Sequence, residues 1–482
     1  MLFNSFGFLA FLTAVVLVFY LLPHRFRGAL LLLASYLFYA SWRPEALLLL
    51  LSITFVAYAG GLAMRRWPAR GRSVLAAGIL IDLGALIVFK YAAFLFDSLE
   101  TFLAFLPFAG TAALPELRIL LPAGLSFYTF STVSYLIDVY RGTMEPERRL
   151  GAFALYVAFF PKIFAGPIER ARTFLPQLER RVPFPAERMT EGLYLLLWGL
   201  FKKVVIADRL GVFVDAAYGM PAYAPAFDLL IAVYFYAFQI YCDFSGYTDM
   251  ARGMARLLGI DLMENFRRPY LAKSTGEFWA KRWHLSLTTW FRDYMYIPMG
   301  GSRVARPRFY FNLMAVFAVS GLWHGAGWTF VVWGALNGLY GWIETATAPL
   351  WRALGRRLPG VKNSPLLTAA RVLLTFHLIT FAWIFFRAPS VGAAWTVITR
   401  LAGSLSMLPR MVQTYRAGPE FVLALAAIGL LLIVELIDER RDLWERLRVK
   451  PTAVRWAYAY LLIAVLLVFG KWGLAQFIYM QF

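Results

Sequence analysis

One of the four histidines of the chain stands alone in a long apolar segment. His324 lies in the run Ser320-Gly-Leu-Trp-His-Gly-Ala-Gly-Trp328, and no other acidic or basic residue occurs between Phe309 and Trp342. Imidazole within a bilayer is costly unless it faces a polar cavity, so an isolated ionisable residue there is a candidate for function. A neutral histidine can accept a proton from a hydroxyl group. The alternative is a hydrogen bond to a neighbouring helix.

The glycines around His324 leave space beside the imidazole. Gly321, Gly325 and Gly327 remove side chains from its surroundings. Small residues of this kind allow a second helix to pack closely, or they allow a substrate to approach.

His284 lies in a segment that is rich in aromatic and polar residues. If residues 277–294 are helical, Lys281, His284 and Thr288 share one face, and Trp283 and Trp290 share another. A polar face with an imidazole, flanked by indoles, suits the wall of a cavity. The alternative is a structural histidine at the membrane surface.

The other two histidines are expected to have structural roles. His24 lies beside Arg25 and Arg27 in a short loop, which is typical of an interfacial position. His377 lies alone in an apolar helix, where we expect a hydrogen bond to a neighbouring helix.

Other catalytic patterns are weak. No serine lies in a Gly-x-Ser-x-Gly context, and no phosphate loop, HExxH motif or metal-ligand spacing occurs. The one cysteine, Cys242, excludes an intrachain disulfide and a cysteine-based zinc site. We therefore expect no metal and no tightly bound cofactor. Asp243 and Asp249 are expected to form ion pairs with the basic segment 250–308 rather than to take part in catalysis.

That basic segment also carries many aromatic residues. It cannot cross lipid as a simple span, because each charge at the bilayer centre costs at least ~2.5 kcal/mol. We expect interfacial helices, or helices packed around a polar cavity inside the protein.

The elements that must position these residues are transmembrane helices. Hydrophobic residues make up 60% of the 482 residues and charged residues 16%, against about 25% charged in a soluble domain. This composition excludes a cytosolic enzyme, a disordered chain and a fibrous one. The net charge of +20 is explained by cytoplasmic loops and anionic lipid headgroups, so nucleic acid is not an expected partner.

We expect an all-α polytopic membrane protein with about eleven spans, each needing roughly 20 apolar residues. The stretch 309–343 is too long for one span and should bend or re-enter, and 150–165 is short enough to be re-entrant. The expected spans are 3–22, 28–42, 45–64, 74–96, 118–139, 190–213, 226–248, 309–343, 366–386, 420–437 and 453–477.

Loop charges predict the orientation of the chain. Residues 65–72 carry four arginines and no acid, whereas 97–117 carry Asp97, Glu100 and Glu116 and no base. Basic loops stay in the cytoplasm. We therefore expect the amino terminus outside, with segment 3–22 as a retained first helix, and the basic run 440–450 inside.

Motifs along the whole chain resemble the membrane-bound O-acyltransferase family, in its bacterial alginate O-acetyltransferase branch. The central matches are CDFSGYTDMARG (242–253), ENFRRPYLAKSTGEFWAKRWHLSLTTWFRDYMYIPMGGSR (264–303) and SGLWHGAGWTFVVWGALNG (320–338). Further matches are LPAGLSFYTFSTVSYLIDVYR (121–141), FFPKIFAGPIER (159–170), FAWIFFRA (381–388) and FIYMQF (477–482).

The resemblance implies one membrane-embedded domain over residues 1–482, with a motif core at about 241–338. It implies a ring of helices around a central funnel and acyl transfer from a thioester to a hydroxyl. His324 then corresponds to the intramembrane histidine of the family and His284 to its second histidine. We assign Trp283, Trp290, Trp323, Trp328 and Asn337 to the cavity wall, and Arg292 with Asp293 to a supporting ion pair.

The resemblance also implies the surroundings of the reaction. The donor would be acetyl-CoA or an acylated carrier protein, and the acceptor an exopolysaccharide such as alginate at the bacterial inner membrane. Periplasmic acetyltransferase partners would complete the modification. D-alanyl transfer, peptidoglycan O-acylation, a transporter with His324 as proton relay, and a structural subunit of a synthase remain as alternatives.

Overall fold

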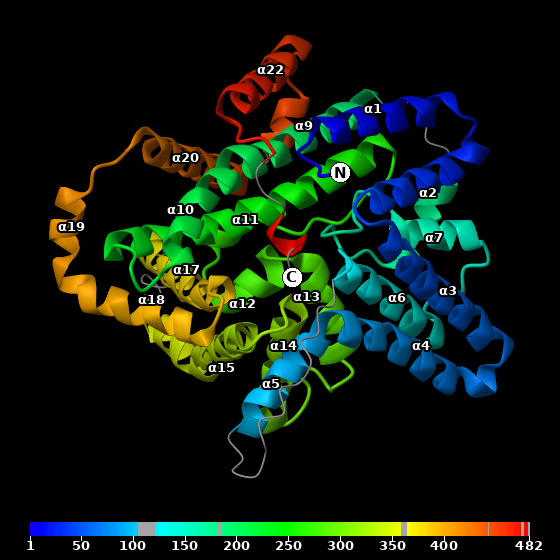
Figure 1. Cartoon of the computed structure of the whole chain (residues 1–482), viewed down its shortest axis with the longest axis horizontal. Helices are drawn as coiled ribbons and strands as arrows, with labels where there is room; N and C mark the ends of the chain where they lie inside the picture. Colours follow the sequence, from blue (N-terminus) through cyan, green and yellow to red (C-terminus); the bar gives the residue numbers. More distant parts are fainter. Residues whose placement is uncertain (105–120, 181–185, 358–363, 442, 474–476, 481–482) are drawn as a thin grey trace. The chain divides into compact units, whose positions relative to one another are not determined.

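A computed structural model covers the chain, and the description below applies to residues 1–104, 121–180, 186–357, 364–441, 443–473 and 477–480. Within these ranges every regular element is helical and no strand occurs (Figure 1). The predicted all-α class is therefore confirmed. Glu116, on which the predicted orientation partly depends, lies outside the described residues.

Seven helical segments of the described residues are long and apolar enough to cross a membrane, which supports the predicted multi-pass architecture without confirming a count of eleven. One of them, Val391–Thr414, was missed in the sequence, because Arg400 and Arg410 interrupt its apolar pattern. The other six are Pro44–Arg66, Pro68–Ala104, Ala226–Leu257, Pro365–Arg387, Pro419–Arg440 and Thr452–Phe469.

Several predicted boundaries differ from the observed ones. Residues 97–104, expected in a loop, belong to a helix that ends at Ala104. The segment 190–213 lies inside a longer helical run from Ala186 to Gly219, because the π-helical turn η4 (Phe201–Ala207) continues the helix without a break. The last predicted span ends at Phe469, since the chain turns at Gly470.

The described residues form two compact units, each of which is considered by itself. The first comprises Met1–Leu193, Ala251–Met263 and Tyr479–Phe482, and the second comprises Tyr194–Met250 and Glu264–Ile478. The expectation of a single domain over the whole chain stays a prediction.

The first unit is built on helices from the amino-terminal part of the chain. α6 packs against α3 and α4, and glycines permit the close approach. A Cβ atom on Gly61 would lie 2.4 Å from the hydroxyl oxygen of Tyr135, and one on Gly78 would lie 2.8 Å from a methyl group of Leu136. The helices are α1 (Phe6–Leu21), α2 (His24–Ala40), α3 (Pro44–Arg66), α4 (Gly71–Leu86), α5 (Ala92–Ala104), α6 (Leu125–Tyr140) and α7 (Leu150–Ala158).

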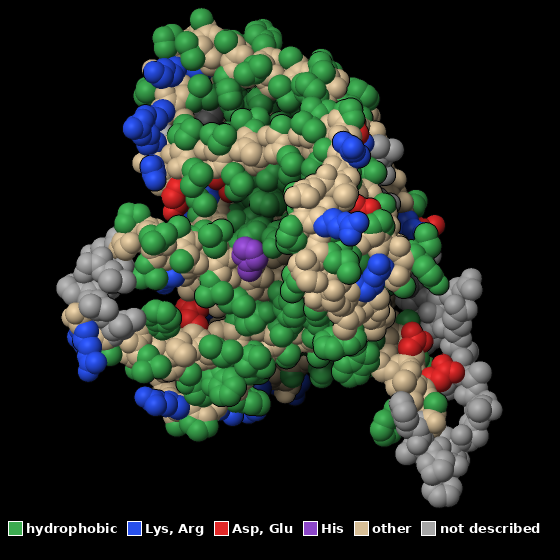
Figure 2. Space-filling model, turned by 90° about the vertical axis from the view of Figure 1, so that its left-hand side faces the viewer, with side chains coloured by type: hydrophobic (Ala, Val, Ile, Leu, Met, Phe, Trp, Pro, Cys, Tyr) green, Lys and Arg blue, Asp and Glu red, His purple; other side chains and the backbone are tan. Residues whose placement is uncertain are grey.

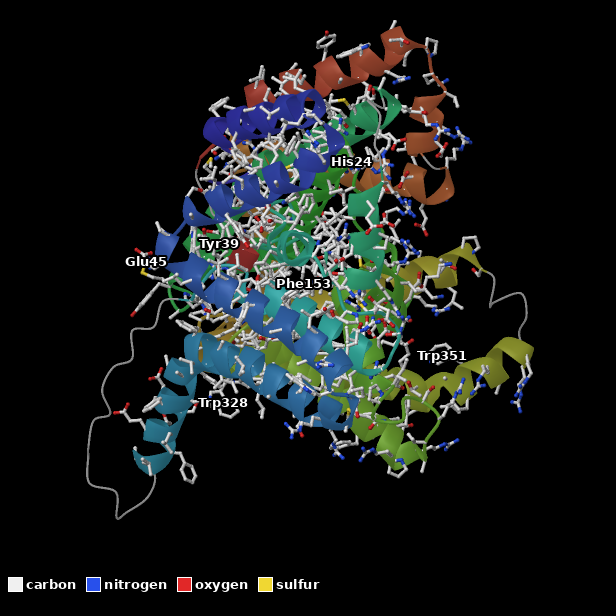
Figure 3. All side chains as sticks on the ribbon, turned by 90° about the vertical axis from the view of Figure 1, so that its right-hand side faces the viewer. His24, Tyr39, Glu45, Phe153, Trp328 and Trp351 are labelled. Carbon is white, nitrogen blue, oxygen red and sulfur yellow. The ribbon has the colours of Figure 1, made fainter. Side chains whose placement is uncertain are left out.

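The stretch 150–165, expected to be short, forms only the two and a half turns of α7 before the chain enters a series of turns. Every residue from 153 to 171 is buried. Phe153 of α7 and Tyr39 of α2 both lie in this interior (Figure 3), where the Phe153 ring packs 4.5 Å from that of Tyr135.

The second unit holds the two candidate histidines. Its longer elements are α10 (Asp208–Gly219), most of α11 (Ala226–Leu257), α14 (Arg306–His324), α15 (Trp328–Arg357), α17 (Pro365–Arg387), α18 (Val391–Ser404), α20 (Pro419–Arg440) and α22 (Thr452–Phe469). α17 packs beside α15 (Figure 1).

The stretch 309–343 bends, as its length predicted. α14 ends at His324 and α15 begins at Trp328, and the two helices pack against each other as a hairpin. A Cβ atom on Gly321 would lie 2.3 Å from the carbonyl oxygen of Phe330, and one on Gly334 would lie 2.4 Å from that of Phe317. The hairpin therefore depends on small residues that let the two backbones meet.

Large hydrophobic side chains are exposed along the outer helices of this unit. Val422 and Ile433 of α20 and Leu467 and Val468 of α22 each expose more than half of their surface. Hydrophobic side chains also cover much of the face shown in Figure 2, with Lys and Arg in scattered groups. Apolar surface of this extent suits contact with lipid.

Candidate active site

His324 is the last residue of α14 and its side chain is 3% exposed. The reversal that follows requires glycine, because a Cβ atom on Gly325 would lie 2.1 Å from the ring of Phe330. The tight turn between α14 and α15 therefore fixes His324 at the closed end of the hairpin.

Aromatic side chains from three helices surround the imidazole of His324. The ring centroids of Trp323 on α14, Trp333 on α15 and Phe386 on α17 lie 5.0, 5.0 and 5.4 Å from its own. Such apolar walls exclude water and strengthen any electrostatic interaction that forms within them.

The second histidine does not lie on a continuous helix, so the predicted shared faces are wrong. The π-helical turn η6 (Phe278–Arg282) ends before Trp283, His284 has φ 46° and ψ 53°, and α13 (Leu285–Phe291) begins after it. Hydrogen bonds to residues 265–268 hold the chain in this break, and these tertiary contacts override the local helical pattern.

The break brings His284 to His324. Their ring centroids are 6.2 Å apart, although the residues are forty positions apart in the sequence. The ring centroids of Trp323 and Phe244 lie 5.8 and 4.7 Å from that of His284. The two imidazoles thus form one buried site with a shared indole neighbour.

His284 lies outside the seven candidate spans and is 1% exposed. Burial lowers its pKa from the ordinary 6.5 to about 3, because an apolar environment disfavours the charged imidazolium. The side chain is therefore a neutral imidazole at physiological pH. A neutral imidazole offers one donor and one acceptor nitrogen.

The four tryptophans assigned to the cavity wall have different positions. Trp323 contacts both histidines, as described, and Trp283 is fully buried between Phe278 and Trp383 at 5.3 and 5.1 Å. Trp290 is 8% exposed and packs against Phe291 and Tyr294.

Trp328 is 60% exposed. It lies at the start of α15, while Trp351 lies near the other end of that helix (Figure 3). Trp328 is therefore not buried, and its assignment to the cavity wall stays a prediction.

Asn337 supports the aromatic wall from behind. Its Oδ1 atom accepts a hydrogen bond from Nε1 of Trp279 at 3.0 Å, and its Nδ2 atom donates to the backbone oxygen of Trp333 at 2.8 Å. Because Trp333 contacts His324, Asn337 fixes a neighbour of the imidazole rather than the imidazole itself.

The predicted ion pair between Arg292 and Asp293 forms, with 2.8 Å between Nε and Oδ1. The Arg292 side chain is however 58% exposed. The pair is therefore a surface feature, and pairs of this kind contribute about 0 to 1 kcal/mol.

Sequence reasoning assigned no role to Trp333, Trp383 and Phe386. Trp333 and Trp383 stack with 5.7 Å between their centroids, and Phe386 packs on both. The available signal was the motif FAWIFFRA, which holds two of the three residues.

Asp243 and Asp249 do form ion pairs, and the partners that the structure shows for them are lysines that precede the segment 250–308. Lys203 lies 2.7 Å from Asp243 and 2.8 Å from Asp208, and Lys202 pairs with Asp249. The reason is the close packing of α9 on α11, where a Cβ atom on Gly199 would lie 2.6 Å from the carbonyl oxygen of Gly246. The lysines one turn beyond Gly199 are thereby placed against the carboxylates.

A distant segment completes this charge cluster. The second oxygen of Asp243 accepts a hydrogen bond from the backbone N–H of Ile478 at 2.8 Å, across 235 residues of sequence. The Phe477 ring lies 4.4 Å from the ammonium group of Lys203. The carboxylate is thus held by two separate parts of the chain.

The remaining two histidines have other partners. A ring nitrogen of His24 lies 2.8 Å from the backbone oxygen of Arg180, at an exposed position. His377 bonds through Nδ1 to the backbone oxygen of Leu373 in its own helix, at 2.7 Å, so the expected bond to a neighbouring helix is replaced by one within α17. In the part of the chain that the structure describes, no group of three or more His, Cys, Asp or Glu side chains could hold a metal ion.

A model of the membrane-bound O-acyltransferase family matches residues 146–386, which include both histidines of the site. The chain belongs to this family. It is therefore an O-acyltransferase, and the resemblance found in its motifs is confirmed.

Relatives with assigned names agree with the family. A probable alginate O-acetylase, AlgI, of Pseudomonas aeruginosa is 40% identical over 399 residues, which are 81% of this chain and 72% of the relative. The protein of the same name from Azotobacter vinelandii is 40% identical over 395 residues, 81% and 76% of the two chains. A peptidoglycan O-acetyltransferase of Helicobacter pylori is 33% identical over 401 residues, 77% and 73% of the two chains.

Proposed function

We propose that this O-acyltransferase moves an acetyl group from a thioester donor, acetyl-CoA or an acylated carrier protein, to a hydroxyl for O-acetylation of an exopolysaccharide of the alginate type. The protein acts in the bacterial inner membrane with its amino terminus in the periplasm. Periplasmic acetyltransferase partners take the acetyl group to the polysaccharide. The 40% identity to probable alginate O-acetylases supports the acetyl group and the acceptor class.

The single observation that supports the mechanism is the pair of buried imidazoles with centroids 6.2 Å apart. His324 accepts the proton of the acceptor hydroxyl as its oxygen attacks the donor carbonyl carbon. The carbon–sulfur bond breaks, and the proton passes from His324 to the departing thiolate, which leaves as a thiol. Protons and charges therefore balance within one turnover.

His284 orients the acceptor or donates a hydrogen bond to the oxyanion in the same step. A neutral imidazole can do this without bringing a charge into the apolar site. Trp323, in ring contact with both histidines at 5.8 and 5.0 Å, lines the space in which the reacting groups meet.

The test uses purified protein in nanodiscs with acetyl-labelled acetyl-CoA, with and without an alginate oligosaccharide, and the transfer rate is measured as loss of the labelled acetyl group from CoA. His324→Ala should lower the transfer rate by about 10²–10⁴-fold, the usual contribution of a positioned acid–base group. His377→Ala is the matched control, because that histidine is exposed on α17, and it should transfer like wild type. Full activity in His324→Ala would refute the mechanism.

The acceptor class is tested in the same assay. The relative from Helicobacter pylori is named peptidoglycan O-acetyltransferase, so a peptidoglycan fragment is the competing acceptor. A relative from Bacillus subtilis, 26% identical over 277 residues, is named teichoic acid D-alanyltransferase, so a D-alanyl thioester is the competing donor. Labelled product on the peptidoglycan fragment alone would overturn the exopolysaccharide assignment. Movement of a solute without consumption of any donor would support transport instead.

A further inference from the structure

His284 has a backbone conformation that its residue type disfavours. Its φ of 46° lies in the left-handed region, which among the described residues other than glycine is shared only by Arg268, with φ 45°. Such a conformation costs about 1–3 kcal/mol and persists only where the surrounding structure over-determines it. The contacts that hold it are therefore informative about the site.

A hydrogen-bonded pairing of two loop segments provides the first set of these contacts. The backbone N–H of Arg267 donates to the oxygen of Arg282 at 2.9 Å. Leu285 donates to the backbone oxygen of Asn265 at 3.1 Å, and Ser286 donates to the side-chain Oδ1 of Asn265 at 3.0 Å. The residues on both sides of His284 are thus bound to the segment 265–267.

Asn265 in effect caps the helix that follows His284. The first turn of α13 has four N–H groups with no partner inside the helix. Asn265 accepts hydrogen bonds from two of these N–H groups. The backbone oxygen of His284 accepts hydrogen bonds from the other two, those of Leu287 and Thr288, at 3.0 Å each. Asn265 is itself 1% exposed, so no solvent can replace it.

Ion pairs with Glu439 of α20 provide the second set of contacts that hold the conformation of His284. Glu439 binds Arg282 through Oε1 and Nη2 at 2.8 Å, and its Oε2 lies 2.7 Å from Nε of Arg268. Arg282 is also bound by Glu277 at 2.7 Å. Glu439 thereby joins Arg268 to Arg282. Arg268 is one of the two residues with positive φ, and Arg282 lies two positions before the other one, His284.

We propose that Asn265 and Glu439 are positioning residues that form a clamp and hold His284 against His324; this inference rests on the proposed function. Without the clamp, residues 283–285 relax to an ordinary conformation, and the imidazole leaves its place 6.2 Å from His324. The clamp touches neither substrate nor reacting atoms and acts only through His284.

The experiment measures both transfer and the placement of His284 in the full-length protein. Acetyl transfer is assayed as above for wild type, Asn265→Ala, Asn265→Asp and Glu439→Gln. In parallel, diethylpyrocarbonate modification of each histidine is followed by mass spectrometry, with His24, at an exposed position outside the candidate spans, as internal reference. Glu439 is partly exposed, so Glu439→Gln is the variant that should retain the fold.

In Asn265→Ala and Glu439→Gln we expect kcat to fall about tenfold or more, with KM within twofold, because small misplacements of a catalytic group cost up to about 10²-fold. Modification of His284 relative to His24 should rise at least about fivefold in the same variants, since release of a group from a buried position restores its access to solvent reagents. Asn265→Asp keeps the oxygen that accepts the Ser286 N–H and should retain protection.

Asp215→Asn is the matched control. It removes an ion pair of similar length, Asp215 with Arg387 at 2.6 Å, whose carboxylate is more exposed than that of Glu439, and should change neither readout. A fall in kcat without increased modification of His284, or unchanged values in both clamp variants, would overturn the clamp. Full transfer by His324→Ala would instead refute the proposed function, while the modification of His284 would still decide whether the clamp holds it.

Discussion

Asn337 donates a hydrogen bond from Nδ2 to the backbone oxygen of Trp333, one turn earlier in α15, at 2.8 Å. The same side chain accepts a hydrogen bond from the indole of Trp279, so one amide joins this indole to the backbone of Trp333, whose ring contacts His324.

Asn337→Leu should therefore weaken both the fold and the reaction. It leaves the Nε1 donor of Trp279 without its acceptor, and a lost buried partner costs about 1–3 kcal/mol. We expect a lower apparent Tm in detergent and a reduced kcat with little change in KM. Asn337→Gln should not restore activity, because its longer side chain does not fit the 1% exposed position. An unchanged kcat in a folded Asn337→Leu protein would contradict the assignment.

Lys203→Met should be among the most destabilising substitutions in the second unit. It leaves the carboxylates of Asp208 and Asp243 buried without their shared cation, and breaking a buried pair typically costs about 3–5 kcal/mol. We expect loss of folded protein on size-exclusion chromatography. The variant Lys203→Met with Asp208→Asn and Asp243→Asn should recover part of the yield; if it does not, the buried carboxylates left without a cation are not the cause.

Gly321→Ala should separate the two helices of the hairpin. Its new Cβ atom would meet the carbonyl oxygen of Phe330 at 2.3 Å, and overpacking of this kind costs about 1–3 kcal/mol. We expect a lower Tm and weaker transfer, because His324 lies one turn further along. Gly429→Ala is the control, since a Cβ atom there meets nothing within 4 Å, and equal Tm values for the two variants would count against a tight hairpin.

Acid should destabilise the protein partly through His284. Because the folded-state pKa lies near 3 and the unfolded one near 6.5, the unfolded state binds more protons between these values, and stability falls as pH falls through this window. Between pH 7.5 and 5 this amounts to at most about 2 kcal/mol.

The measurement is the change in Tm between those two pH values in His284→Gln and in wild type. His284→Gln should lose less Tm on acidification, and His377→Gln should behave like wild type because that side chain is exposed. Identical losses in all three proteins would show that His284 is not buried as a neutral group.

Local pattern predicted the helices well, and predicted the site only in part. The bend near His324 follows from the length of an apolar run and its glycines, which are local features. The conformation of His284 does not follow from local features, because it is set by Asn265 and Glu439, which lie 19 and 155 positions away in the sequence. The partners of Asp243 were missed for the same reason, since Lys203 is placed by packing of two glycines between helices.

The exposed Trp328 illustrates a different limit. The sequence shows that an indole follows the turn, but which side it faces depends on how α15 leaves the turn. The span Val391–Thr414 was missed because an arginine can lie along a helix at the edge of a bilayer and extend its charge to the headgroups.

The bond between Asp243 and the N–H of Ile478 has a consequence for biosynthesis. The two residues are 235 positions apart, which at 5–20 residues per second corresponds to about 10–50 s of translation. Throughout that interval α11 can be inserted while one oxygen of Asp243 still awaits its donor. The second unit thus acquires this contact late, and a nascent chain stalled before residue 478 lacks one of the donors that hold the Asp243 carboxylate.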